Sequence, residues 1–371
     1  MGLILIPLIY VKENDVLGKS LIDKDHQVLL KKGMTLKKNQ IKKLMELGYN
    51  NLYIASSVDY EPEEFLDSVD RDVLMKKFRS IFMKMRKICE YEQKRSRSRN
   101  TSHIIKLEEE KTNEIREVSR DVVEIVGNIM SSKKDYIDYV TIKNHTNYPY
   151  HHAIDTGILA TLIGKKLNMN ARQLVDIFMA SIVSELGNAC LPPKLLNKKG
   201  KLESFEFELI KQHPENGYNT AKGCTFLSHS VKLICLEHHE RIDGNGYPNK
   251  LIGNEIDIKA RVLAVADAYD SLTSSRTYRP PYPPHKALTI ISSEVGKSYE
   301  GDVVGALYRI IVPYPIGSVV KLNTKELGLV IGIHRDIPER PVLITTNTMQ
   351  PKKVDLKIET TVEIVGLNYG Q

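Results

Sequence analysis

The chain has 371 residues, of which 42% are hydrophobic and 27% charged, a balance that is ordinary for a globular protein with a sizeable buried core. The length favours two or three domains, and no stretch reaches the roughly eighteen uncharged apolar residues of a membrane-spanning helix. The net charge of +7 favours an acidic partner such as a nucleotide, nucleic acid or anionic lipid, without choosing among them.

Cys89, Cys190, Cys224 and Cys235 show no C-x-x-C spacing, which excludes a zinc ribbon and a dithiol redox motif. Reduced thiols are therefore expected. The apolar start Leu3–Tyr10 is too short to span a bilayer and has no basic region before it, so it predicts a strand and not a signal peptide. Together these features favour a cytoplasmic protein.

Residues 1–58 are predicted to form a small α/β module. Thr35 is expected to cap its helix and Gly48 to end it. The predicted elements are strands Leu3–Tyr10, Val28–Leu30 and Asn51–Ile54 and a helix over Lys37–Leu47. No ligand motif is present in this module.

Residues 59–130 are predicted to form a helical, basic connecting region. Apolar residues recur at helical spacing from Val73 to Ile88 and again over Ile115–Met130. The charged faces favour packed helices with a solvated side over helices that lie on a membrane. Between them, Lys94–Asn100 predicts a flexible basic loop without the aromatic residues that stack on bases, so DNA or RNA is not an expected partner.

Residues 131–312 contain histidines and aspartates that are placed on or beside apolar, helix-like segments. They are His152, His213, His238, His239, Asp267 and Asp270. Imidazole nitrogens combined with carboxylate oxygens suit Fe, Mn or Zn better than Mg or Ca, which prefer oxygen alone. Each histidine taken alone is equally compatible with a place in the core or at a helix end.

Residues 313–371 change character and predict a small β module. Its expected strands are Ser318–Lys321, Leu327–Ile333, Arg340–Thr345 and Thr361–Ile364, separated by Gly, Asn and Pro.

Several spaced motifs fall between about residues 130 and 310. They are Tyr150–Ala153, Leu191–Leu202, Lys211–Tyr218, His238–Pro248, Ala260–Thr273 and Arg276–Arg279. Together they resemble the HD-GYP phosphodiesterases, a branch of the HD metal-dependent phosphohydrolases that cleave cyclic di-GMP. The resemblance implies a mainly α fold, with an HD-type helical bundle between a small α/β N-terminal module and a small β C-terminal module. It also implies a regulatory role for the N-terminal module, against which a purely structural role stays open.

One segment departs from the family's pattern. Where the family carries His-Asp-Ile-Gly-Lys, this chain has Ser184, Glu185, Leu186, Gly187 and Asn188. A histidine ligand is lost, a bridging aspartate is replaced by a glutamate one methylene longer, and a phosphate-contacting lysine is replaced by a neutral amide.

Carried over position by position, the resemblance implies a set of site residues. The metal ligands are His152, Glu185, His213, His238, His239 and Asp267. The catalytic residues are Glu185 and Asp270, and the substrate contacts are Asn188, Arg276 and Arg279. The interaction loop comprises Asp243, Gly244, Gly246, Tyr247 and Pro248.

The implied cofactors are two divalent ions, Mn or Fe, or only one because Ser184 leaves the first ion a ligand short. Tyr148 stands where family members with a third metal carry a glutamate, so at most two ions are expected.

Two functional hypotheses follow from the resemblance. The first is a metal-dependent phosphodiesterase that hydrolyses cyclic di-GMP to linear pGpG in bacterial second-messenger signalling, with further cleavage to GMP left open. The second is a degenerate HD-GYP protein that binds cyclic di-GMP or a protein partner without cleaving it. The implied partners are cyclic di-GMP and a diguanylate cyclase or another signalling protein, and a homodimer through the long helices stays open.

Overall fold

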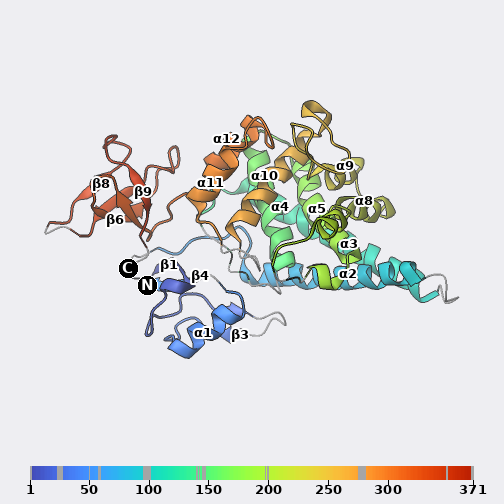
Figure 1. Cartoon of the computed structure of the whole chain (residues 1–371), viewed down its shortest axis with the longest axis horizontal. Helices are drawn as coiled ribbons and strands as arrows, with labels where there is room; N and C mark the ends of the chain where they lie inside the picture. Colours follow the sequence, from blue (N-terminus) through green and yellow to red (C-terminus); the bar gives the residue numbers. More distant parts are fainter. Residues whose placement is uncertain are drawn as a thin grey trace.

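The computed structural model describes residues 2–22, 28–49, 51–56, 60–94, 102–138, 141, 143, 148–196, 198, 200–274, 281–347 and 350–368. Helices form the central body, and small sheets lie at the two ends of the chain (Figure 1). The expected mainly α fold, with strands confined to the two ends, is confirmed. Among the described residues, no helix has both the length and the apolar character needed to cross a membrane.

The N-terminal module has a core of its own. β1 (Gly2–Pro7) pairs antiparallel with β4 (Asn51–Ser56). The other elements are η1 (Leu8–Tyr10), β2 (Leu21–Ile22), β3 (Val28–Leu30) and α1 (Lys38–Glu46). The prediction of Thr35 as the helix cap is wrong, because the chain is still extended at Lys37, whose backbone amide takes the side-chain oxygen of Gln40 as its acceptor at 2.9 Å.

α2 (Ser68–Lys94) and α3 (Ser102–Ser131) are long helices that pack antiparallel. Ion pairs between Lys77 and Asp121 and between Lys84 and Glu114 define this direction. Their apolar faces belong to the same buried core as the helices that follow. We predicted a separate connecting region ending at residue 130, and this shared core favours one packing unit.

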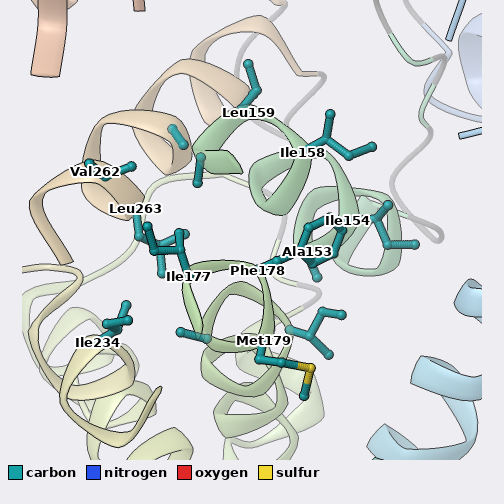
Figure 2. Close-up of a cluster of buried hydrophobic side chains, with 14 of the residues drawn as sticks. Ala153, Ile154, Ile158, Leu159, Ile177, Phe178, Met179, Ile234, Val262 and Leu263 are labelled. Atoms are coloured by element: carbon teal, nitrogen blue, oxygen red, sulfur yellow. The ribbon is translucent and has the colours of Figure 1, made fainter. Parts of the chain in front are cut away.

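α4 (Tyr148–Lys166) and α5 (Ala171–Leu186) form the centre of that core. Figure 2 shows Ala153 and Ile154 of α4 facing the α5 residues Phe178 and Met179. The two helices pack closely because Gly157 has no side chain: a Cβ there would lie 2.7 Å from the Phe178 ring.

Short helices surround this pair and complete the bundle. They are η2 (Gly187–Cys190), α6 (Pro193–Leu196), α7 (Ser204–Ile210), α8 (His213–Gly223), α9 (His229–Glu237), η3 (Gly253–Glu255), α10 (Ile258–Thr273), α11 (Pro284–Ser292) and α12 (Gly301–Ile310).

The C-terminal module is a five-stranded antiparallel sheet with the order β8-β7-β6-β5-β9. Its strands are β5 (Val319–Leu322), β6 (Leu327–Gly332), β7 (Val342–Thr345), β8 (Lys353–Asp355) and β9 (Ile364–Leu367). β8 was not predicted, because only three residues of a lysine-rich segment form it, and β9 begins at Ile364, where the predicted strand ended. The four domain boundaries that we predicted remain proposals.

The expectation of reduced thiols is wrong for one pair of cysteines. Cys89 of α2 and Cys190 of η2 form a disulfide, with their Cα atoms 5.3 Å apart and a sequence separation of 101. Cys224 and Cys235 are free and buried. Spacing along the chain could not indicate this bond, because it depends on how α2 packs against η2.

Candidate metal centre

Three histidines, the histidine triad, converge at the ends of two helices. His213 begins α8, and His238 and His239 follow the end of α9. The Nε2 atom of His213 lies 3.2 Å from Nε2 of His238 and 3.1 Å from Nε2 of His239. The same ring nitrogen of each residue is thus directed towards one point.

Backbone carbonyls orient two of these rings. His213 Nδ1 lies 2.8 Å from the carbonyl oxygen of Ile210, and His238 Nδ1 lies 2.8 Å from that of Cys235. An Nδ1–H in each ring donates to the carbonyl, and this tautomer leaves Nε2 with a free lone pair. The main chain of each helix end therefore prepares its own histidine as a ligand.

Two glycines let α8 approach the end of α5, which carries Glu185. A Cβ on Gly187 would lie 2.1 Å from the carbonyl oxygen of His213 and 2.7 Å from the amide nitrogen of Gly217. A Cβ on Gly217 would lie 3.0 Å from Cα of Ser184. Larger residues at these positions would push His213 away from α5.

The second group, the mixed group, combines one histidine with two carboxylates. It consists of His152 of α4, Glu185 of α5 and Asp267 of α10. His152 Nε2 lies 2.8 Å from Asp267 Oδ1 and 3.8 Å from Glu185 Oε1. The charges of His152 and Asp267 also shift the pKa values of His238 and His239, so the two groups lie within electrostatic reach of each other.

Two histidines of the triad, His238 and His239, are neutral at pH 7. Burial, reinforced by the neighbouring His213, lowers the pKa of His238 to about 4. Burial and the adjacent His238 hold the pKa of His239 well below its usual value. Neutral imidazole is the form that binds a metal ion.

His152 has the opposite electrostatic setting. Burial alone would lower its pKa, but hydrogen bonds to Asp267 and Asp270 outweigh burial and raise the pKa to about 9. Burial also opposes ionisation of Asp267, yet its hydrogen bond to His152 holds the pKa of this carboxyl below its usual range. A metal ion at the mixed group must therefore displace a proton from His152.

The histidine triad has the ligand spacing of a divalent cation, whereas the mixed group is wider, with 3.8 Å between His152 Nε2 and Glu185 Oε1. Metal–nitrogen bonds of about 2.0–2.1 Å that meet at about 90–110° place neighbouring ligand atoms about 2.8–3.4 Å apart. The separations of 3.2 and 3.1 Å in the histidine triad fall within this range. All-nitrogen and mixed nitrogen and oxygen donors both suit first-row transition metals.

Asp270, which we predicted to be catalytic, lies behind His152. Its Oδ2 is 2.6 Å from His152 Nδ1, and its Oδ1 is 2.5 Å from Lys143 Nζ. Both carboxylate oxygens are therefore engaged inside the bundle. This geometry favours a role in positioning His152 over direct contact with a substrate.

Two departures from the family's pattern are accommodated within the helices. The hydroxyl of Ser184 donates to the carbonyl oxygen of Ser181 at 3.3 Å, so it is engaged within α5. Tyr148 stacks on the ring of His152, with the ring centroids 5.0 Å apart. Ser184 thus contacts α5 and Tyr148 contacts α4, at the positions where the family's pattern has a metal-binding side chain.

The predicted substrate contacts are only partly described. Asn188 Nδ2 donates to Glu185 Oε2 at 3.0 Å, so Asn188 orients a candidate ligand. Arg276 and Arg279 lie outside the described residues. Their contact with phosphate, and that of Asn188 with substrate, stay predictions.

The predicted interaction loop is held from within. The buried carboxylate of Glu240 accepts hydrogen bonds from three consecutive backbone amides, those of Asn249, Lys250 and Leu251, at 2.6, 3.1 and 3.1 Å. Asp243 accepts from the amide of Asn245 at 3.0 Å. Gly244 has a φ of 78°, and a Cβ on Gly246 would lie 2.4 Å from the backbone of Glu240. The loop therefore has one fixed shape.

Tyr247 of this loop, followed by Pro248, faces the histidine triad. Its ring stacks on His239 with the centroids 4.9 Å apart. The exposed ring of Phe207 meets the edge of Tyr247, and Lys211 Nζ lies 4.9 Å from the Phe207 centroid. Sequence reasoning missed Phe207 and Lys211, which place an aromatic surface and a cation beside the triad.

Sequence reasoning also missed three charged residues behind His152, which are Arg71, Lys143 and Asp155. Asp155 gave a usable signal, because a carboxylate three residues after His152 on an apolar helix requires a buried partner. Its partners come from distant segments, and no local pattern indicates them.

Residues 124–303 match the family model of the HD domain. The chain is 32% identical over 213 residues to the cyclic di-GMP phosphodiesterase PA4108 of Pseudomonas aeruginosa, covering 57% of this chain and 51% of that protein. It is 36% identical over 152 residues to the cyclic di-GMP phosphodiesterase response regulator RpfG of Xanthomonas campestris pv. campestris, covering 41% and 40%. It is 26% identical over 209 residues to the cyclic di-GMP phosphodiesterase PdeB of Borreliella burgdorferi, covering 56% and 55%.

The chain thus spans about half the length of the curated relatives that it matches. The matched residues include every member of the histidine triad and of the mixed group. Residues 124–303 therefore match the HD domain, and the chain is similar over part of its length to proteins named as cyclic di-GMP phosphodiesterases.

Proposed function

We propose that this chain is a metal-dependent phosphodiesterase that hydrolyses cyclic di-GMP to linear pGpG in bacterial second-messenger signalling. The observation that carries the proposal is the pair of ligand groups within one HD domain, each with a histidine Nε2 directed at its partners. The relatives named as cyclic di-GMP phosphodiesterases supply the substrate class.

The chain's own residues hold and orient the components of the reaction. When bound, two divalent cations, Mn or Fe on ligand chemistry, supply the positive charge and the activation of water that in-line phosphodiester hydrolysis requires. The rings of His213, His238 and His239 would hold one cation, and the mixed group would hold the other. Asn188 fixes one oxygen of Glu185, while the other oxygen faces His152.

Tyr247 and Phe207 favour a ligand with aromatic bases. The Tyr247 ring stacks on His239 of the triad, the Phe207 ring meets Tyr247 from its outer side, and Lys211 adds a positive charge beside the Tyr247 ring. A guanine base and a phosphate of a cyclic dinucleotide match this combination. The Tyr247 ring faces the triad and is therefore not available to a protein partner. A diguanylate cyclase or another protein partner would then bind the polar residues at the edge of the loop, including Asp243.

A second candidate function is binding of cyclic di-GMP without cleavage. It is favoured by one observation. Ser184 stands where the family's pattern has a histidine, and its hydroxyl donates within α5, so the mixed group has one histidine fewer than that pattern. A single ion at the histidine triad would then support binding alone.

The test is chromatographic turnover of cyclic di-GMP by the full chain with added Mn or Fe. Glu185→Ala is compared with Glu215→Ala, an exposed glutamate of α8 that belongs to neither ligand group. We expect hydrolysis that Glu185→Ala abolishes and Glu215→Ala leaves unchanged. Retained nucleotide without any linear product would replace the hydrolase with the binding protein.

A further inference from the structure

A row of buried charges of alternating sign lies behind His152. Arg71 Nη1 of α2 is 2.6 Å from Asp155 Oδ1 of α4. The other oxygen of Asp155 is 2.9 Å from Lys143 Nζ, and the same Nζ is 2.5 Å from Asp270 Oδ1. Asp270 Oδ2 then meets His152 Nδ1 at 2.6 Å. The row connects α2 with the ring of a predicted metal ligand.

These side chains are almost completely withdrawn from water. The exposed fractions are 6% for Arg71, 8% for Asp155, 3% for Lys143 and 7% for Asp270. Burying an ion costs several kcal/mol unless a partner of opposite charge lies against it. A chain that needed only a stable core would be served as well by apolar residues. The row therefore calls for an explanation beyond stability.

We propose that Lys143, anchored by Asp155 and Arg71, is a positioning residue that sets His152 for metal binding through Asp270. This inference rests on the proposed metal-dependent function. The Lys143 ammonium holds one oxygen of Asp270, so the carboxylate cannot turn away from the imidazole. The second oxygen accepts the Nδ1 proton of His152, which directs Nε2 towards Glu185 and Asp267.

The histidine triad needs no such support, because the Nδ1 atoms of His213 and His238 donate to neutral backbone carbonyls. A backbone carbonyl is held by its helix, whereas the Asp270 side chain can rotate unless both oxygens are bound. Ser274 Oγ assists, lying 3.0 Å from Lys143 Nζ and 3.3 Å from Asp270 Oδ2. Loss of the Lys143 charge should thus weaken metal binding at the mixed group and leave metal binding at the histidine triad unchanged.

The row also reaches the N-terminal module. Arg71 Nε lies 3.8 Å from Glu64 Oε2, and Glu64 Oε1 lies 2.6 Å from Lys19 Nζ. Lys19 lies just before β2 of that module, so the module touches the outer end of the row.

The test is titration of the full chain with Mn(II), followed by the electron paramagnetic resonance signal of free Mn(II), with thermal unfolding measured in parallel. Lys143→Met is compared with Lys134→Met, which removes another buried lysine, paired with Asp138 at 2.8 Å and outside the row. We expect two ions in the native chain. We expect Lys143→Met to weaken one of them about 10–100-fold and leave the other unchanged. Lys134→Met should keep both ions.

Lys143→Arg, which keeps the charge, should restore most of the lost affinity. If Lys143→Met does not fold, Lys143→Gln takes its place, because it keeps a donor without the charge. Equal weakening by the Lys143 and Lys134 variants, or unchanged Mn(II) binding by Lys143→Met, would overturn the proposal. The titration contains no nucleotide, so an inactive chain that shows this pattern keeps the positioning role and loses only the hydrolase.

Discussion

The histidine triad and the mixed group both lie within residues 124–303, which match the HD domain, but they are built in different ways. The triad comes from two neighbouring helix ends, His238 and His239 are neutral, and carbonyls one turn away fix His213 and His238. The mixed group draws its members from α4, α5 and α10, and a charged row fixes its histidine. We therefore expect metal binding at the triad, which local backbone contacts hold, to tolerate distant substitutions, whereas metal binding at the mixed group, which long-range ion pairs hold, should not.

The largest effect is expected from removal of His213, whose Nε2 lies close to the Nε2 atoms of both His238 and His239. His213→Ala should abolish metal binding at the triad and lower turnover by more than about 100-fold, since loss of a residue behind a ligand already costs about 10–100-fold. The mixed group should still take up Mn(II), because none of its members is changed. Metal analysis and turnover of the purified variant measure both effects.

His334→Ala, in the C-terminal sheet module, is the matched control and should leave both metal ions in place. Loss of both ions from His213→Ala would contradict the independence of the two groups.

The next effect concerns the close contact between the backbones of Gly187 and His213, which brings α8 to the end of α5. Gly187→Ala should lower the free energy of unfolding by about 1–3 kcal/mol, because its Cβ would overlap the carbonyl oxygen of His213. Mn(II) affinity of the triad should fall with it. Gly127→Ala in α3, where no atom lies within 4 Å of the added Cβ, should instead stabilise the chain by about 0.5–1 kcal/mol. Denaturant titration of both variants measures their free energies of unfolding. Equal values would contradict the close contact between Gly187 and His213.

A change in stability of similar size, with a smaller effect on metal binding, is expected from the loop that covers the triad. Glu240→Gln should destabilise the chain by about 1–3 kcal/mol, because the new amide group cannot accept from all three backbone amides. The Michaelis constant should rise more than the turnover number falls, since Tyr247 contacts His239 and does not belong to a ligand group. Unchanged kinetics would show that loop shape does not matter for substrate.

The smallest effect is expected at the position that departs most from the family. Ser184→Ala should change Mn(II) affinity of the mixed group less than about twofold and stability by no more than about 1 kcal/mol, because its hydroxyl is bonded within α5. A lost Mn(II) ion in this variant would instead make Ser184 a ligand.

Much of the fold could be predicted where one local signal was strong. The apolar stripe of α3 and the apolar run of α5 predicted both helices to within a few residues at their C-terminal ends. The motifs placed His213, His238 and His239 in one set, and the structure brings their Nε2 atoms together. Short elements such as β8 were missed, because three residues carry too little pattern.

The features that escaped prediction all depend on long-range packing. Lys143 and Asp270 are 127 residues apart, and the charge of one lysine among many does not reveal which carboxylate it meets. The disulfide between Cys89 and Cys190 joins elements 101 residues apart in the same way. Asp155 was missed too, but it differs from these residues, because its place on an apolar helix already required a buried partner.

The most direct test of the central claim is the metal content of the purified full chain after Mn(II) loading and gel filtration, measured by mass spectrometry in the sample used for cyclic di-GMP turnover. We expect two ions per chain together with linear product, one ion in Glu185→Ala, and none in a variant that also lacks His213. One ion or none in the native chain, with cyclic di-GMP left intact, would contradict the proposal that the mixed group works beside the histidine triad.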